Sequence, residues 1–149
     1  SPQIDLVYGD CYETTEPNED FESNSSSGRL YQHSKMSFSK ENMIKCLPGP
    51  MPMWRKEMNV KHGLFDTTFD FADDWEMWLR AVSGGSKFKK VDAVVGLYLT
   101  GGRSQSEVLN LKQKSEESEL FFKYSHLFGG NYDKFKDYFS QFRSTENVI

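Results

Sequence analysis

The segment that decides the fold reads Ala72-Asp73-Asp74-Trp75-Glu76-Met77-Trp78-Leu79-Arg80. Apolar side chains recur at i, i+3, i+4 and i+7, the spacing of one helix face; these are Trp75, Trp78, Leu79 and Val82. The pair Gly84-Gly85 then ends the pattern. The sequence therefore predicts an amphipathic helix whose first turn carries carboxylates and whose apolar face is directed to a core.

Two of these carboxylates have a structural explanation that requires no function. Asp73 is placed to cap the helix, Glu76 follows three residues later as in a capping box, and the helix dipole favours acids at this end. Asp74 is explained less well, because it lies about 100° around the helix from Trp75, at a border where a carboxylate can overlook a pocket. The dipole is expected to keep Asp74 ionised, with a lowered pKa. On the residues alone, capping is favoured over catalysis.

The chain before this helix is expected to form a strand, a surface loop, a stiff loop and a second helix. Residues 4–8 are an apolar run that Gly9-Asp10 should end, and residues 13–28 are too polar to be buried. Residues 47–54 place three prolines and a glycine among large apolar side chains, which predicts a stiff loop outside any strand ladder. Residues 54–62 favour a helix.

The chain after the central helix is expected to form strand and then helices. Residues 87–99 read as one or two strands, and residues 107–128 and 131–142 read as helices with aromatic side chains at helical spacing. We expect these helices to pack back on the domain, because a membrane anchor would carry more Lys and Arg on its polar face. The fold class predicted is α/β, a mixed sheet with packed helices and a helical C-terminal tail.

The composition of the 149 residues excludes several classes of protein. With 27% charged and 37% apolar residues, a membrane span is not expected. Acidic residues outnumber basic ones by 22 to 18, which argues against a nucleic-acid partner. Cys11 and Cys46 are too few for a disulfide framework or a zinc site, and no export signal opens the chain, so we expect a cytoplasmic protein with reduced thiols.

Aromatic residues are unusually frequent, with 12 Phe, 7 Tyr and 3 Trp. Such rings fill cores, and their flat faces also stack on sugars. Trp54 and Trp75 are therefore candidates either for sugar stacking or for core filling, whereas Trp78 is predicted to be core. Because the chain opens at Ser1 directly before an apolar strand, we expect a fragment of a longer protein.

Four blocks follow one another along the chain: Asp5-Leu6-Val7-Tyr8-Gly9-Asp10, Pro48-Gly49-Pro50-Met51-Pro52-Met53-Trp54-Arg55-Lys56, Gly63-Leu64-Phe65-Asp66 and Asp73-Asp74-Trp75-Glu76-Met77-Trp78-Leu79-Arg80. In this order they resemble the C-terminal, acceptor-side half of a family 2 glycosyltransferase of GT-A (nucleotide-diphospho-sugar transferase) fold. The resemblance covers about residues 4–106. It implies that residues 1–106 are half of a GT-A catalytic domain and that residues 107–149 are a helical extension packing on it.

The family resemblance reverses the preference for capping. In that family an acidic pair followed by Trp begins the helix under the acceptor pocket, and its second acid is the catalytic base, which implies Asp73 and Asp74 as the catalytic pair with Asp74 as base. The implied reaction is transfer of a sugar from a nucleotide-sugar donor to a carbohydrate or lipid-linked acceptor, as in polysaccharide biosynthesis, with inversion. The implied substrate-binding residues are Pro50, Met51, Pro52, Met53, Trp54, Trp75 and Glu76.

The donor side of such an enzyme is incomplete in this sequence. The family neutralises the leaving diphosphate with a divalent metal, Mn²⁺ or Mg²⁺, held by an Asp-x-Asp motif that this chain does not contain. We therefore expect no metal ligands here and no sugar transfer by these 149 residues alone. Arg103 resembles a phosphate-binding residue of a late family loop, although a Gly-Gly-Arg turn is more often only a turn. A sheet lacking its other half would expose apolar surface, so self-association is expected.

Two alternatives remain open. The first is a non-enzymatic carbohydrate-binding or interaction module in which the acidic helix start is purely structural. The second, a two-carboxylate glycosidase, is the weakest, because the adjacent residues Asp73 and Asp74 point in different directions, whereas hydrolysis needs carboxyl groups that face each other. The discriminating observation is whether Asp74 opens into a cavity beside residues 48–54 or has its carboxylate occupied by backbone amides or an ion pair.

Overall fold

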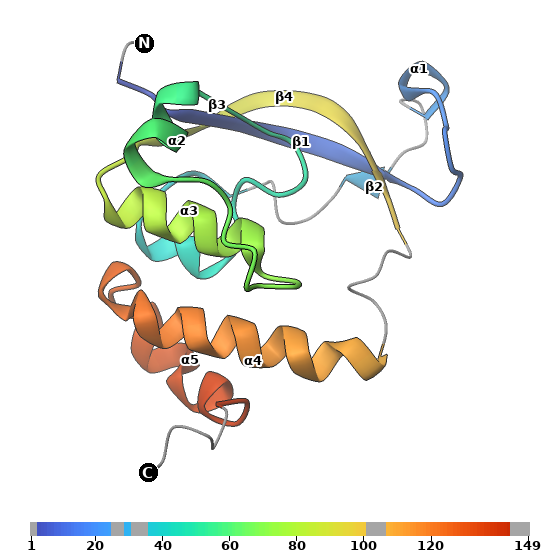
Figure 1. Ribbon diagram of the computed structural model, residues 1–149. Coiled ribbons are helices and arrows are strands. Elements are labelled where there is room, and N and C mark those ends of the chain that lie inside the picture. Colours follow the sequence, from blue (N-terminus) through green and yellow to red (C-terminus); the bar gives the residue numbers. More distant parts are fainter. Residues whose placement is uncertain (1–2, 25–28, 31–35, 101–106, 144–149) are drawn as a thin grey trace.

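The computed structural model of the chain describes residues 3–24, 29–30, 36–100 and 107–143, which form one mixed α/β arrangement. Figure 1 shows three layers: a sheet, the helix α3 beneath it, and the helices α4 and α5 on the far side of α3. The strands are β1 (Leu6–Thr14), β2 (Arg29–Leu30), β3 (Pro52–Trp54) and β4 (Phe88–Leu99). The α-helices are α1 (Phe21–Asn24), α2 (Lys56–His62), α3 (Asp73–Ser83), α4 (Glu107–Lys123) and α5 (Asn131–Ser140), and two 3₁₀ turns are η2 (Glu41–Ile44) and η4 (Ser125–Leu127).

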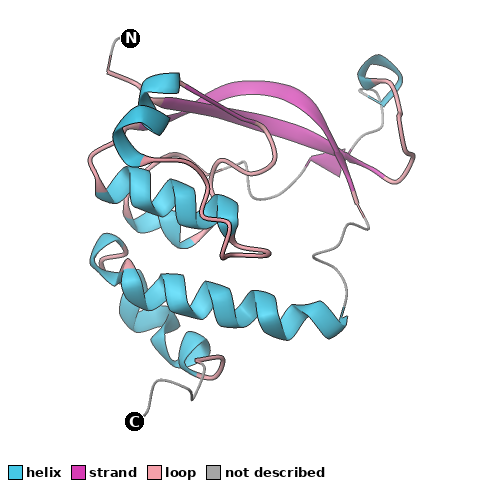
Figure 2. Cartoon of the chain, viewed as in Figure 1, coloured by secondary structure: helices cyan, strands magenta, loops and turns pink. Residues whose placement is uncertain are grey.

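The strand β1 is the centre of the sheet. The strand β4 pairs with it in parallel along its length, while β3 and β2 pair antiparallel with its first and second halves on the opposite edge. The helices α3, α4 and α5 all lie on one side of this sheet (Figure 2). The predicted mixed sheet with packed helices is confirmed at this level of detail.

The predicted end of the first strand at Gly9-Asp10 is wrong, because β1 continues to Thr14. Its pairing with β4 shifts register on both sides of Asp10, so the glycine marks an irregularity inside the strand. A Cβ atom at Gly9 would lie 2.8 Å from the carbonyl oxygen of Ala93. Glycine is therefore required here by the close approach of β4 and does not mark a turn.

The prediction that residues 47–54 stay outside any ladder is also wrong in part. Pro52–Trp54 form β3, in which Pro52 is the first residue and pairs with Tyr8. Proline is tolerated at this position because β3 is an edge strand, where one row of N–H groups has no ladder partner. The helix expected over residues 54–62 accordingly begins two residues later, at Lys56.

The helix α3 is buried on two sides, beyond the single apolar face that its spacing predicts. Trp78 packs toward the sheet, with ring centroids 5.2 Å from Trp54 and 6.3 Å from Phe88. Trp75 packs the other way, against Phe128 and Phe139 of the C-terminal segment. A helix between two layers is covered on both faces, which explains why Met77 and Ala81 are also buried.

The C-terminal helices pack back on the domain through aromatic side chains, as predicted. The ring of Phe121 stacks on three others, with its centroid 4.4 Å from that of Phe139, 5.5 Å from Tyr132 and 5.6 Å from Phe128. Buried residues from both the sheet part and this tail belong to one core cluster. Within the described ranges no helix combines the length and the apolar character needed to cross a bilayer.

Candidate functional site

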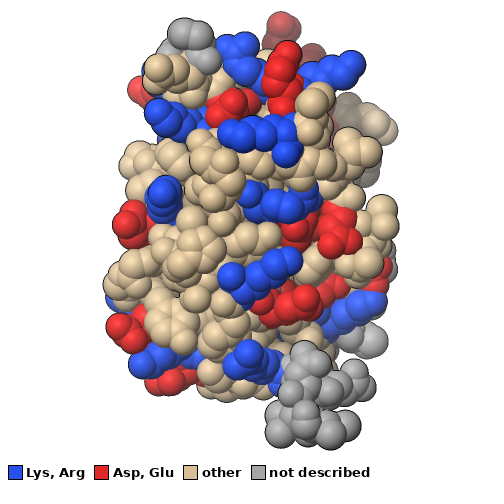
Figure 3. Space-filling view, turned by 60° about the vertical axis from the view of Figure 1, so that its left-hand side comes forward, with Lys and Arg blue, Asp and Glu red and all other residues tan. Residues whose placement is uncertain are grey.

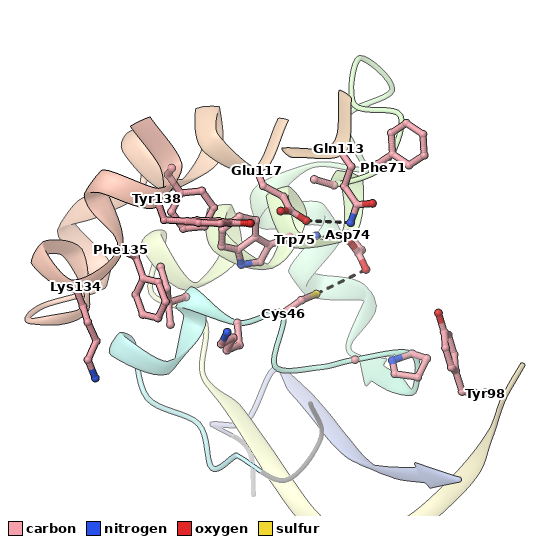
Figure 4. A pocket seen from close by; sticks show the side chains of 16 residues that line it. Cys46, Phe71, Asp74, Trp75, Tyr98, Gln113, Glu117, Lys134, Phe135 and Tyr138 are labelled. Carbon is pink, nitrogen blue, oxygen red and sulfur yellow. Dashed lines mark hydrogen bonds between the residues drawn. The ribbon is translucent and has the colours of Figure 1, made fainter. Parts of the chain in front are cut away.

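A cavity of about 730 Å³ lies where α3, α4, α5 and the segment after η2 meet, within the size range of small-molecule sites. Figure 4 shows Asp74 and Trp75 of α3 close to Gln113 and Glu117 of α4 at one wall of this cavity. The lining residues are Ile44, Lys45, Cys46, Gly49, Pro50, Phe71, Ala72, Asp74, Trp75, Tyr98, Gln113, Glu117, Lys134, Phe135, Tyr138 and Phe139. Residues far apart in the sequence thus form one pocket around the start of α3.

Asp74 opens into this cavity beside Gly49 and Pro50 of the proline-rich segment. One carboxylate oxygen, Oδ1, accepts a hydrogen bond from the backbone N–H of Trp75 at 2.6 Å. The other, Oδ2, accepts one from the Cys46 thiol at 3.7 Å, drawn as a dashed line in Figure 4. Among the described residues no Lys or Arg forms an ion pair with Asp74. The carboxylate is therefore partly engaged by the backbone and partly directed to the cavity.

The predicted lowering of the Asp74 pKa is wrong, because the pKa is raised. Loss of water around the carboxyl group is the largest cause, the negative charge of Asp73 adds to it, and the Trp75 N–H bond acts in the opposite direction. The side chain is accessible from the cavity, yet protein atoms surround it closely enough for desolvation to outweigh the backbone N–H. A raised pKa makes this carboxylate a stronger base.

The predicted capping by Asp73 and Glu76 is wrong as well. The helix begins at Asp73, its N-cap residue is Ala72, and no side chain of the cap residue bonds the helix. Glu76 is buried and pairs instead with Arg80, at 2.9 Å between Oε1 and Nε. Asp73 is half-buried and is not among the residues that line the cavity.

The segment just before α3 is held by Glu116, a buried residue of α4. Its carboxylate accepts hydrogen bonds from the backbone N–H groups of Asp70, Phe71 and Ala72, at 2.8 to 3.1 Å. The side chain of Lys112 also pairs with Asp70. Because backbone N–H groups before a helix attract anions, α4 fixes the segment from which Asp74 projects.

The same helix supplies a second carboxylate to the cavity. Glu117 is half-buried, and its Oε1 accepts a hydrogen bond from Nε2 of Gln113 at 3.0 Å. Burial raises the pKa of Glu117, and the negative charge of Asp74 raises it further. Neither residue is among those predicted from the sequence, although Gln113 and Glu117 stand at i and i+4 and so share one helix face.

Cys46 was predicted to be reduced, and both cysteines are indeed free thiols. Burial raises the pKa of the Cys46 thiol well above its ordinary value, and the charge of Asp74 and the hydrogen bond to it act in the same direction. The thiol therefore stays protonated and donates to the Asp74 carboxylate. This contact helps to hold Asp74 in place.

The predicted substrate-binding segment divides between two surfaces. Pro50 lines the cavity, whereas Met51 packs against Gly96 of β4. Met53 and Trp54 border a shallower hollow of about 380 Å³ on the sheet, which Pro52 does not line. The indole of Trp54 also packs on Trp78, so it belongs to the core.

Two further predicted residues have different outcomes. Trp75 does line the cavity, although it is buried, and its indole N–H donates to the carbonyl oxygen of Met43 at 2.8 Å. Arg103, predicted to bind phosphate, lies outside the described residues. Of the predicted residues that the structure describes, only Pro50, Asp74 and Trp75 therefore come together at this cavity.

On the face drawn in Figure 3, basic and acidic side chains are interspersed with uncharged surface. In the part of the chain that the structure describes, no three His, Cys, Asp or Glu side chains are grouped as metal ligands.

A scan of protein-family models, a search of curated proteins and a search of solved structures each returned no match to this chain.

Proposed function

We propose that this chain is the acceptor side of a glycosyltransferase in which Asp74 is the general base. The observation that carries the proposal is the position of Asp74, whose carboxylate opens into a cavity of about 730 Å³ next to Gly49 and Pro50. Its raised pKa suits proton abstraction from a hydroxyl group. The family resemblance of the four sequence blocks supports the same assignment.

In the proposed reaction Asp74 takes the proton of an acceptor hydroxyl as its oxygen attacks the anomeric carbon of the donor sugar. A carbon–oxygen bond forms to the acceptor, the bond to the nucleoside diphosphate breaks on the opposite side, and the configuration inverts. The Cys46 thiol and the Trp75 N–H hold the carboxylate in place through the hydrogen bonds described above. Asp73 contributes through its charge, which raises the pKa of Asp74.

Aromatic side chains around the cavity support a saccharide as ligand. Phe71, Trp75, Phe135 and Tyr138 are all among its lining residues. Flat rings beside carboxylates and amides bind sugars by combining stacking with hydrogen bonds to hydroxyl groups. This combination distinguishes the cavity from a purely apolar pocket.

We further propose that the mixed sheet is part of a GT-A fold and that the donor diphosphate and its metal bind outside these 149 residues. Neither an Asp-x-Asp motif in the sequence nor a ligand group in the described residues provides for them. When bound, the metal would neutralise the leaving diphosphate. The proton transfer that we assign to this chain, from the acceptor hydroxyl to Asp74, does not involve the metal.

The alternative, a carbohydrate-binding module with a structural acidic helix start, has one observation in its favour. Asp74 Oδ1 is occupied by the backbone N–H of Trp75. Against it, the expected capping pair does not cap α3, because the N-cap residue is Ala72 and Glu76 pairs with Arg80 instead. The second oxygen of Asp74 remains on the cavity side, with a thiol as its partner.

The test uses the full-length gene product that carries this sequence. It is incubated with UDP-, GDP- and dTDP-sugars, Mn²⁺ or Mg²⁺, and a panel of methyl glycosides as acceptors, and release of nucleoside diphosphate is measured. Asp74→Asn is expected to lower turnover by roughly a hundredfold or more, the usual contribution of a general base. Asp133→Asn is the matched control, because Asp133 is also in the first turn of a helix but does not line the cavity.

Normal turnover by Asp74→Asn would disprove the assignment of the base. Acceptor-dependent turnover in none of the combinations would favour the binding module. Loss of turnover in both variants would show that the effect is not specific to the cavity, and this too counts against the proposal.

A further inference from the structure

We propose that Glu117 of α4 is a second acceptor-binding carboxylate, so that α4 and α5 set the specificity of the cavity for neutral, hydroxyl-rich saccharides. This inference rests on the proposed function for the identity of the ligand. It adds a residue that neither the four sequence blocks nor the predicted site includes, and it narrows the expected carbohydrate acceptor to neutral saccharides.

Glu117 lies in the same cavity as Asp74 and is oriented by a neighbouring side chain. Glu117 and Asp74 come from different helices and line the same cavity (Figure 4). Gln113 donates to Oε1 of Glu117, which fixes the orientation of that carboxylate. Among the described residues no donor is bonded to its Oε2, so this oxygen is available to a ligand hydroxyl.

Asp74 and Glu117 form one wall of the cavity, and their charges determine which ligands this wall can bind. Ionised carboxylates accept hydrogen bonds and donate none, so the wall formed by Asp74 and Glu117 requires a ligand rich in donors. The two negative charges repel phosphate and carboxylate groups at this wall, and Glu117 is close enough to Asp74 for its pKa to be raised by that charge. Lys45 and Lys134, which also line the cavity, lie at its Phe135 end, away from Asp74 (Figure 4). The wall therefore favours a neutral polyol and disfavours the diphosphate of a sugar donor.

The aromatic rings of the cavity favour a ligand with a ring that can stack on them. Phe135 and Tyr138, which are on α5, line the cavity together with Trp75. The ammonium group of Lys45 lies 5.5 Å from the centre of the Phe135 ring and so occupies one face of it. A ring-shaped ligand would then stack on the aromatic wall while its hydroxyl groups reach the two carboxylates.

Binding can be measured without any transfer reaction. Saturation-transfer NMR of the 149-residue chain with methyl glycosides of common hexoses and N-acetylhexosamines, and with glucose 1-phosphate, gives a relative affinity for each. Glu117→Gln is expected to weaken the best glycoside by about tenfold, the cost of one hydrogen bond to a charged group. Glu119→Gln, on the same helix but exposed and outside the cavity, is the matched control.

The binding results for the variants and for glucose 1-phosphate decide whether Glu117 has the proposed role. Weakening by Glu117→Gln together with poorer binding of glucose 1-phosphate than of methyl glucoside supports the inference. Unchanged binding in Glu117→Gln, equal weakening in Glu119→Gln, or no binding of any glycoside overturns it. A wild-type chain that prefers glucose 1-phosphate also overturns it. The role of Asp74 as base is tested separately, by the turnover of the full-length protein and its loss in Asp74→Asn. A negative result in the binding experiment therefore overturns the role of Glu117 without deciding the role of Asp74.

Discussion

The carboxylate of Glu116, on α4, accepts a hydrogen bond from the backbone N–H of Ala72, the N-cap residue of α3, at 3.1 Å. The two preceding N–H groups bond to the same carboxylate. A side chain 44 residues away in the sequence thus satisfies the backbone N–H groups of the segment that leads into α3. The position of the candidate base depends on this contact between two helices.

Removal of the Glu116 carboxylate is expected to destabilise the protein strongly. Glu116→Ala leaves three N–H groups without their charged acceptor and opens space in the core, so we expect a loss of about 3 kcal/mol in the free energy of unfolding. Urea denaturation followed by circular dichroism measures this loss. Glu119→Ala, on the exposed side of α4, should change it by no more than about 0.5 kcal/mol, and equal losses in the two variants would contradict the role of Glu116 in holding the segment before α3.

The contact between Gly9 and β4 gives a second prediction. Gly9→Ala places a Cβ atom 2.8 Å from the carbonyl oxygen of Ala93, and backbone cannot move away as a flexible side chain could. We expect a loss of about 2 kcal/mol in the free energy of unfolding, measured by urea denaturation. Gly130→Ala is the matched control, because it has helical dihedral angles and open space around its Cβ position, and should be neutral or slightly stabilising.

The parts of the fold that the sequence predicts correctly are those with local signals. The helix α3, the strand β4 and the break at Gly129-Gly130 each have a clear periodicity or a clear terminator, so their position does not depend on distant residues. The errors occur where a distant strand decides the outcome. Gly9 lies inside β1 because β4 passes close to it, and Pro52 joins the sheet because β1 offers it an edge.

The candidate site was predictable only in part, for a similar reason. Asp74 could be singled out because local capping did not explain it, and it does open into a cavity. Its environment could not be inferred, since Cys46 and Glu117 come from segments 28 and 43 residues away and no spacing rule connects them. The direction of the Asp74 pKa was predicted wrongly because the helix dipole is a local property, whereas the desolvation that raises this pKa arises only in the packed structure.

The hydrogen bond between Cys46 and Asp74 predicts the reactivity of the thiol. Both native thiols should react slowly with iodoacetamide at about pH 8, since burial raises the pKa of Cys46 well above its usual range and that of Cys11 to about 11. Asp74→Asn removes a charge that raises the Cys46 pKa, so alkylation of Cys46 should become several-fold faster. Mass spectrometry of the two peptides measures both rates, with Cys11 as internal reference. An unchanged ratio of the rates would show that Asp74 does not act on the thiol.

The two cavity carboxyls predict a stability that falls as the pH rises. Desolvation raises the pKa of Asp74 from 3.8 and that of Glu117 from 4.5. Each folded carboxyl therefore binds protons more tightly than the unfolded one, so the free energy of unfolding decreases from the ordinary pKa up to the raised one and stays lower above it. The double variant Asp74→Asn, Glu117→Gln has no such charge to desolvate. Its melting temperature relative to wild type should therefore be higher at about pH 7 than at about pH 3, whereas a difference independent of pH would mean that both carboxyls are well solvated in the folded chain.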